Sequence, residues 1–186
     1  MRELAAQTGQ RLGVQEDRVA VSTFQLGYAA RLWSPVLACA LAGRIVPDLG
    51  RLQVGTGLPL RLWLPAAAGW HVPDDGMLAD ALYRVVMTDH LAPLAAGLRG
   101  QLAEGLLRGN AASAMIGSVT VLTIARPGLA QPARLVAGRL LATGLLRGTG
   151  SLTGTGLEFR RNSCCLYYRV PGGGLCGDCS LRQDER

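Results

Sequence analysis

Four of the five cysteines lie near the end of the chain, where Cys164, Cys165, Cys176 and Cys179 form the pattern C-C-x10-C-x2-C. Thiolates are the ligands of structural zinc sites and of iron–sulfur clusters. Core packing does not explain the grouping, because a glycine-rich segment cannot bury four small apolar side chains separately. The pattern therefore predicts a metal centre, in preference to unrelated thiols or two disulfides.

The spacing favours one kind of centre over another. A zinc ion bound by four thiolates usually takes them from two C-x2-C pairs, and here only Cys176 and Cys179 form such a pair. Side chains of neighbouring residues diverge in extended backbone, so Cys164 and Cys165 fit poorly on one small tetrahedral ion. A [2Fe-2S] cluster spreads its four ligand positions over two iron atoms. The spacing thus favours iron–sulfur, and zinc stays open as an alternative.

The residues around the cysteines suit a negatively charged centre. An all-cysteine [2Fe-2S] centre carries about −2, and about −3 after one-electron reduction. Guanidinium groups nearby would favour the reduced form, glycines would let the backbone approach sulfur, and a tyrosine would shield the cluster. We expect the following residues beside it: Arg160, Arg161, Tyr168, Arg169, Gly174 and Gly177. Solvated arginines and a simple glycine turn are the alternative interpretation.

The segment SCCLYYRVPGGGLCGDCSL, residues 163–181, resembles the C-terminal signature of the FhuF-type ferric-siderophore reductases. The resemblance implies that Cys164, Cys165, Cys176 and Cys179 ligate a [2Fe-2S] cluster. Two upstream stretches, YAARLWSP at 28–35 and GNAAS at 109–113, are weaker points of similarity.

The implied activity is the transfer of one electron to ferric iron held by a siderophore, with release of ferrous iron. Hydroxamate and catecholate oxygens bind hard Fe(III) far more tightly than Fe(II), so reduction loosens the chelate. We expect a siderophore of the hydroxamate type. Arg31, Trp70 and His71 are the residues we expect to contact it.

No G-x-G-x-x-G motif follows an expected strand, so the sequence offers no dinucleotide site. An external electron donor is therefore expected, such as a ferredoxin or a flavin reductase, and the net charge of +6 would assist docking of an acidic donor. An iron–sulfur redox sensor or regulator and a structural zinc-binding module are the alternative functions. The arginines are spaced singly along the chain, so nucleic acid is not an expected partner.

Composition narrows the class of protein. The chain has 186 residues, of which 49% are hydrophobic and 17% charged, and this excludes intrinsic disorder. All 19 basic residues are arginine, which excludes a Schiff-base lysine and a P-loop lysine. The longest uncharged stretch, 109–125, is too short to span a bilayer, and the N-terminus lacks the apolar region of a signal peptide. We therefore expect a cytoplasmic protein without a membrane span.

The elements that must position the cysteines read as an α+β fold. We expect a helix-rich body with a small antiparallel β element over 1–146 that docks substrate and partner. A Gly/Thr-rich connector or kinked hairpin over 147–156 and an irregular iron–sulfur segment over 157–186 would follow.

Within the body, one strand is expected over 19–26 and a hairpin between 51–54 and 58–64. Cys39 lies in an apolar helix and is expected to be buried. The expected helices cover 2–18, 28–43 with a break at Pro35, a segment capped by Asp74 or Asp75, 94–107, 111–125 capped by Asn110, and 131–146.

Overall fold

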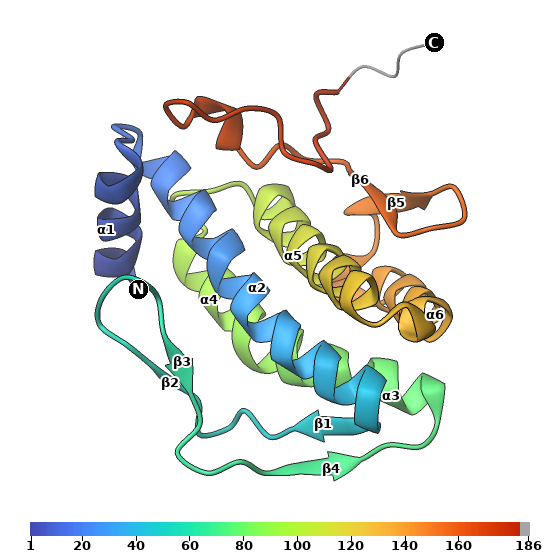
Figure 1. Ribbon diagram of the computed structural model, residues 1–186. Helices are drawn as coiled ribbons and strands as arrows, with labels where there is room; N and C mark the ends of the chain where they lie inside the picture. Colours follow the sequence, from blue (N-terminus) through green and yellow to red (C-terminus); the bar gives the residue numbers. More distant parts are fainter. Residues whose placement is uncertain (183–186) are drawn as a thin grey trace.

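Two long helices that lie side by side form the centre of the molecule. The computed structural model describes residues 1–182, and Figure 1 shows α2 (Asp17–Gly43) lying beside α5 (Glu104–Ala125). The first helix, α1 (Arg2–Leu12), packs on α2 and ends at Gly13, whose φ of 64° is readily adopted only by glycine. Most of the buried core comes from aliphatic and alanine side chains of α2, α5 and the helices around them.

The strand expected over 19–26 is wrong, because this segment is the first part of α2. Its β-branched residues favour a strand locally, but the buried positions of α2 recur every three or four residues, as the helical period requires. The helix also continues through Pro35 without the expected break, and Pro35 is exposed. Burial against α1 and α5 thus outweighs local propensity.

The expected start of α5 is also wrong. The helix begins at Glu104, six residues before Asn110, so Asn110 lies inside it and is fully buried. The helix start has no side-chain cap, and packing of Leu106 and Leu107 in the core stabilises its first turns instead.

The remaining helices pack around α2 and α5. α3 (Asp75–Leu82) has Asp74 as its N-cap, with the carboxylate accepting a hydrogen bond from the backbone N–H of Met77 at 2.8 Å, which confirms the expected cap. A π-helical segment over 83–91 joins α3 to α4 (Ala92–Leu98). α6 (Ala130–Leu141) ends before the expected residue 146 and is followed by a short 3₁₀ turn at Gly144–Leu146.

All three β ladders of the described chain are short and antiparallel. β1 (Ile45–Pro47) pairs with β4 (Gly69–His71). β2 (Gln53–Val54) pairs with β3 (Leu62–Trp63), which confirms the expected hairpin. β5 (Gly150–Thr153) pairs with β6 (Glu158–Arg161), so residues 150–161 form a hairpin that leads into the cysteine segment. The α+β, helix-rich class is thereby confirmed.

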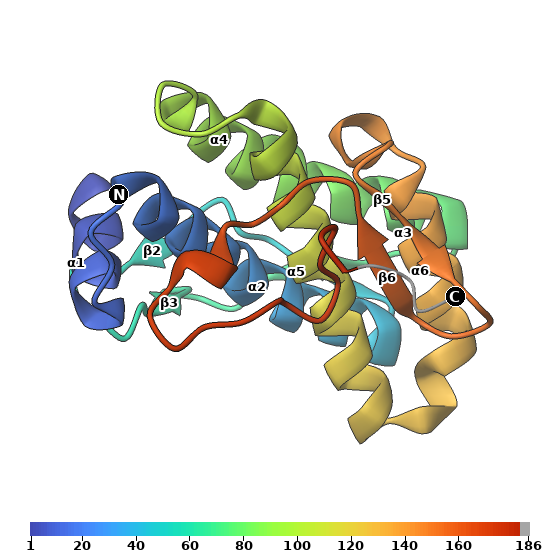
Figure 2. The same cartoon turned by 90° about the horizontal axis from the view of Figure 1, so that it is seen from above.

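The cysteine segment lies across the two central helices. Figure 2 shows it running from β6 over α5 and α2 towards α1, while Figure 1 shows β1 and β4 on the other side of α2. No helix within residues 1–182 combines the length and apolar character needed to cross a bilayer.

Trp33 and Trp63 provide a matched test of this core. Trp33 is fully buried in α2, whereas Trp63 is 47% exposed on β3. Trp33→Ala is expected to lower the free energy of unfolding by about 3–5 kcal/mol through the cavity it leaves. Trp63→Ala should cost about 1 kcal/mol or less. Urea unfolding of both variants measures the difference, and equal losses would contradict the placement of Trp33 in the core.

Candidate metal centre

The structure brings two of the four clustered sulfurs into contact. Cys165 Sγ lies 3.5 Å from Cys176 Sγ, and all the cysteines are free thiols. Two sulfurs bound to one tetrahedral metal at about 2.3 Å lie about 3.8 Å apart, so this pair suits two positions on one metal atom. Within the described residues, no three His, Cys, Asp or Glu side chains converge as ligands of a single ion.

The other two sulfurs accept backbone hydrogen bonds. Cys164 Sγ accepts from the N–H of Leu166 at 3.3 Å, and Cys179 Sγ accepts from the N–H of Leu181 at 3.4 Å. Leu166 has a φ of 67°, unusual for a residue with a side chain, and this conformation turns the chain just after the adjacent cysteine pair. Such N–H donors stabilise thiolate charge and tune the potential of an iron–sulfur centre.

Burial raises the pKa of the Cys176 thiol, and the adjacent Cys165 sulfur and Asp178 add to the shift. The thiolate is the form that binds metal, so its formation at this position needs a compensating positive charge. A metal ion supplies that charge, and its binding would release the proton.

A buried polar network anchors the segment to both central helices. Arg161 Nη2 donates to Asn110 Oδ1 at 2.7 Å, and Asn110 Nδ2 donates to Ser22 Oγ at 3.1 Å. The Ser22 hydroxyl in turn donates to the carbonyl of Cys165 at 2.6 Å. Asn110 and Ser22 are fully buried, and Arg161 is 1% exposed. The network therefore joins β6, α5, α2 and the cysteine pair.

The guanidinium at the start of this network is only partly satisfied. Arg161 Nε and Nη1 are buried without a hydrogen-bond partner, and no described carboxylate pairs with the group. Burying an uncompensated cation is costly, so the position suits an anionic neighbour. The backbone N–H of Arg161 donates to the carbonyl of Asp178, between Cys176 and Cys179, at 3.1 Å. A [2Fe-2S] centre with four thiolates, at about −2, has the required sign.

Residues 161–181 match the FhuF 2Fe-2S C-terminal domain. The match covers the four clustered cysteines and points to a [2Fe-2S] cluster, in agreement with the resemblance seen in the sequence. A search of curated proteins and a search of solved structures each found no match to the chain.

A glycine on α5 allows residues 161–181, hereafter the FhuF-type segment, to lie close to the helix. A Cβ at Gly109 would overlap Ser163 Oγ and come within 3.0 Å of Arg161 Nη2. Ser163 Oγ donates to the carbonyl of Gly105 at 2.9 Å, which adds a second attachment. The GNAAS stretch therefore carries Gly109, which admits the segment, and Asn110, which binds it.

The other residues expected around the cluster differ in their contacts and in their exposure to solvent. Arg160 hydrogen-bonds the carbonyl of Arg182. Arg169 pairs with Glu16 at 3.1 Å and lies 5.9 Å from the ring centre of Tyr168, which is 46% exposed. Gly174 and Gly177 are exposed, and a Cβ at either position would meet no neighbour.

The turn between the two cysteine pairs depends on two other glycines of the same run. Gly172 has a φ of 69°, and a Cβ at Gly173 would lie 2.8 Å from the carbonyl oxygens of Tyr167 and Val170. Ser22, Gly109 and Asn110 were not expected at the site. The sequence gives only one sign of a role for Asn110 at this site, namely that its polar side chain lies in an otherwise mostly apolar helical stretch.

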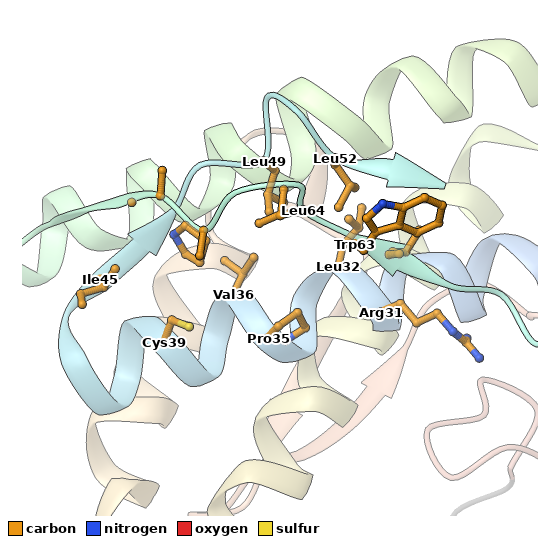
Figure 3. A pocket seen from close by; sticks show the side chains of 15 residues that line it. Arg31, Leu32, Pro35, Val36, Cys39, Ile45, Leu49, Leu52, Trp63 and Leu64 are labelled. Atoms are coloured by element: carbon orange, nitrogen blue, oxygen red, sulfur yellow. The ribbon is translucent and has the colours of Figure 1, made fainter. Parts of the chain in front are cut away.

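The residues expected to contact the siderophore lie elsewhere. Trp70 and His71 belong to β4, on the far side of α2 from the FhuF-type segment (Figure 1). Arg31 donates to the carbonyls of Leu60 and Gly27 at 3.0 and 2.9 Å. It borders an apolar cavity of about 540 Å³, and Figure 3 shows its guanidinium directed away from that cavity. The structure does not bring these three residues to the cysteines.

The expected burial of Cys39 is wrong. Cys39 is exposed and lines the same cavity, because it lies on the face of α2 that the β1–β4 region leaves open.

Gly109→Ala tests the close approach of segment and helix. The added methyl should displace Ser163 and Arg161, lower the free energy of unfolding by about 1–3 kcal/mol and reduce iron content. Gly117→Ala in the same helix meets no neighbour and should stabilise by about 0.5–1 kcal/mol. Urea unfolding and iron analysis of both variants make the comparison. Unchanged stability and iron content in Gly109→Ala would contradict the seating described above.

Proposed function

We propose that this protein is a ferric-siderophore reductase that holds a [2Fe-2S] cluster through Cys164, Cys165, Cys176 and Cys179. The observation that carries the proposal is the match of residues 161–181 to the FhuF 2Fe-2S C-terminal domain. The contact between Cys165 and Cys176 and the incompletely paired Arg161 are consistent with it.

When bound, the cluster supplies one electron at a time. Ferric iron that gains this electron becomes ferrous, and no covalent bond to the chelator has to be broken first. Hydroxamate oxygens bind Fe(II) weakly, so water can replace them and the metal leaves. We propose a hydroxamate chelate as the substrate. The step requires neither a nucleophile nor a proton donor from the chain.

Residues of the chain stabilise the charge on the sulfurs and fix the position of the cysteine backbone. The N–H groups of Leu166 and Leu181 stabilise negative charge on two sulfurs, and Ser22 fixes the backbone at Cys165. Arg161, a buried cation, favours the more negative, reduced state and so raises the reduction potential.

The electron must come from a separate donor, for which we propose a ferredoxin or a flavin reductase. The net charge of +6 favours an acidic surface on that partner. We further propose a reducing compartment such as the cytoplasm, because the ligands must stay free thiols until the cluster is assembled.

Anaerobically purified protein is expected to absorb visible light and to contain about two irons per chain. Cys176→Ser should lose most of both, whereas Cys39→Ser should keep both because Cys39 lies in a separate cavity. In a single turnover, a ferric trihydroxamate should reoxidise the reduced protein. A colourless protein with one zinc would contradict the cofactor, and a reduced cluster inert to every ferric chelate would contradict the reductase activity.

Arg161→Met should lower the reduction potential, because the reduced state loses a buried positive charge. We expect at least a tenfold change in the one-electron equilibrium constant, which corresponds to about 59 mV. Arg161→Lys should restore most of the potential. Arg169→Met is the matched control, since Arg169 is already paired with Glu16 near solvent. Redox titration followed by electron paramagnetic resonance measures all three, and equal potentials would refute the role of Arg161.

A further inference from the structure

A cavity of about 450 Å³ opens beside the turn that joins Cys176 to Cys179. Gly177 and Asp178 of that turn form part of its wall. The rest comes from one face of α5 around Gly117 and from Phe159 and Glu158 of β6. The cavity therefore touches the candidate metal centre directly.

This cavity continues into a second one of about 530 Å³. Both are lined by Thr120, Leu157 and Glu158, and the second extends to Arg134 of α6. Together they form a trough between α5 and the β5–β6 hairpin, which Figure 2 shows beside each other. Each cavity falls in the range of about 300–1,000 Å³ typical of small-molecule sites.

We propose that the ferric chelate docks in this trough, against the Cys176–Cys179 turn. The inference rests on the proposed reductase function and gives it a location different from Arg31, Trp70 and His71. Electron transfer weakens steeply with separation, so the substrate must lie next to the cluster. The trough meets that requirement, whereas the apolar cavity of Figure 3 lies along the far part of α2.

The lining of the trough suits such a molecule. Ser113, Thr120 and Thr123 offer hydroxyl groups, while Ile116, Leu157 and Phe159 offer apolar contact for aliphatic linkers. Asp178 Oδ2 is buried without a hydrogen-bond partner, and Glu158 is exposed beside it in the wall. Arg134, in the second cavity, donates through Nη2 to the carbonyl of Gly154, and its Nη1 is buried without a hydrogen-bond partner. Two carboxylates against one guanidinium favour a neutral or cationic chelate over a multiply charged anion.

Gly117 keeps the trough open. It is exposed on α5, and a Cβ there would meet no atom within 4 Å. A large side chain at this position would therefore fill the trough without a clash in the core. Gly97 of α4 is equally unobstructed and lies outside both cavities, so it provides a matched control.

The test compares Gly117→Trp and Gly97→Trp in the full-length holoprotein. Reduced protein is mixed with ferric desferrioxamine B, a trihydroxamate, and separately with ferricyanide, a small oxidant that needs no pocket. Binding of the redox-inert gallium(III) complex of desferrioxamine B is measured by calorimetry. One electron passes per chelate, converting Fe(III) to Fe(II) and returning the protein to its oxidised state.

Gly117→Trp should slow oxidation by the chelate at least tenfold and weaken gallium-complex binding by a similar factor. Its cluster spectrum and its rate with ferricyanide should be unchanged, and Gly97→Trp should match wild type throughout. Wild-type rate and binding in Gly117→Trp would overturn the trough as the docking site. If this variant loses its cluster, Val121→Trp replaces it, because Val121 is 68% exposed and lines the same cavity.

A failure of the proposed function gives a different result. In that case, wild-type reduced protein would react with ferricyanide and not with any ferric chelate. A trough used only by the electron donor would leave chelate binding intact in Gly117→Trp while slowing reduction by the donor, and that outcome also overturns the proposal.

Discussion

The attachment of the cysteine segment to the two central helices depends on the buried guanidinium of Arg161. Arg161 is the last residue of β6, and its side chain lies between the cysteine segment and α5. Its one described side-chain partner there is Asn110. The Asn110 amide donates a hydrogen bond to the Ser22 hydroxyl, and the Ser22 hydroxyl donates one to the backbone carbonyl of Cys165. Each of these polar groups is costly to bury alone, so the segment, β6 and the two helices have to come together. The charge left on Arg161 is balanced when an anionic centre lies near it.

This arrangement divides the molecule into two faces. The FhuF-type segment lies over α5 and the first part of α2, and the short β1–β4 and β2–β3 ladders lie on the far side (Figures 1 and 2). The trough lies on the same side as the segment, between α5 and the β5–β6 hairpin. Two glycines of α5 shape the first face. The missing side chain at Gly109 leaves room for Ser163, and the missing side chain at Gly117 leaves the trough open. In the proposed function, the cluster and the substrate site would therefore both adjoin α5, which packs on α2.

Several features follow from local chemistry and were predictable from the sequence. The Asp74 cap needs only a carboxylate directly before a helical stretch, and the β2–β3 hairpin needs only alternation around a glycine turn. The error at residues 19–26 has the opposite origin: β-branched side chains prefer strands by themselves, but packing on α1 and α5 selects the helix. Asn110 was expected at a helix end because asparagine caps helices, and the partner that explains its interior position is 51 residues away in sequence.

The sequence by itself determined the chemistry of this protein: four thiols at a characteristic spacing predict a [2Fe-2S] centre, because ligand type and spacing along the chain are local properties. The tertiary structure alone decided the surroundings of that chemistry. Which arginine is buried, which helix residues reach the cysteines and where an open trough meets them all depend on the helix faces that pack together. Such contacts join residues distant in the chain, and no local pattern encodes them.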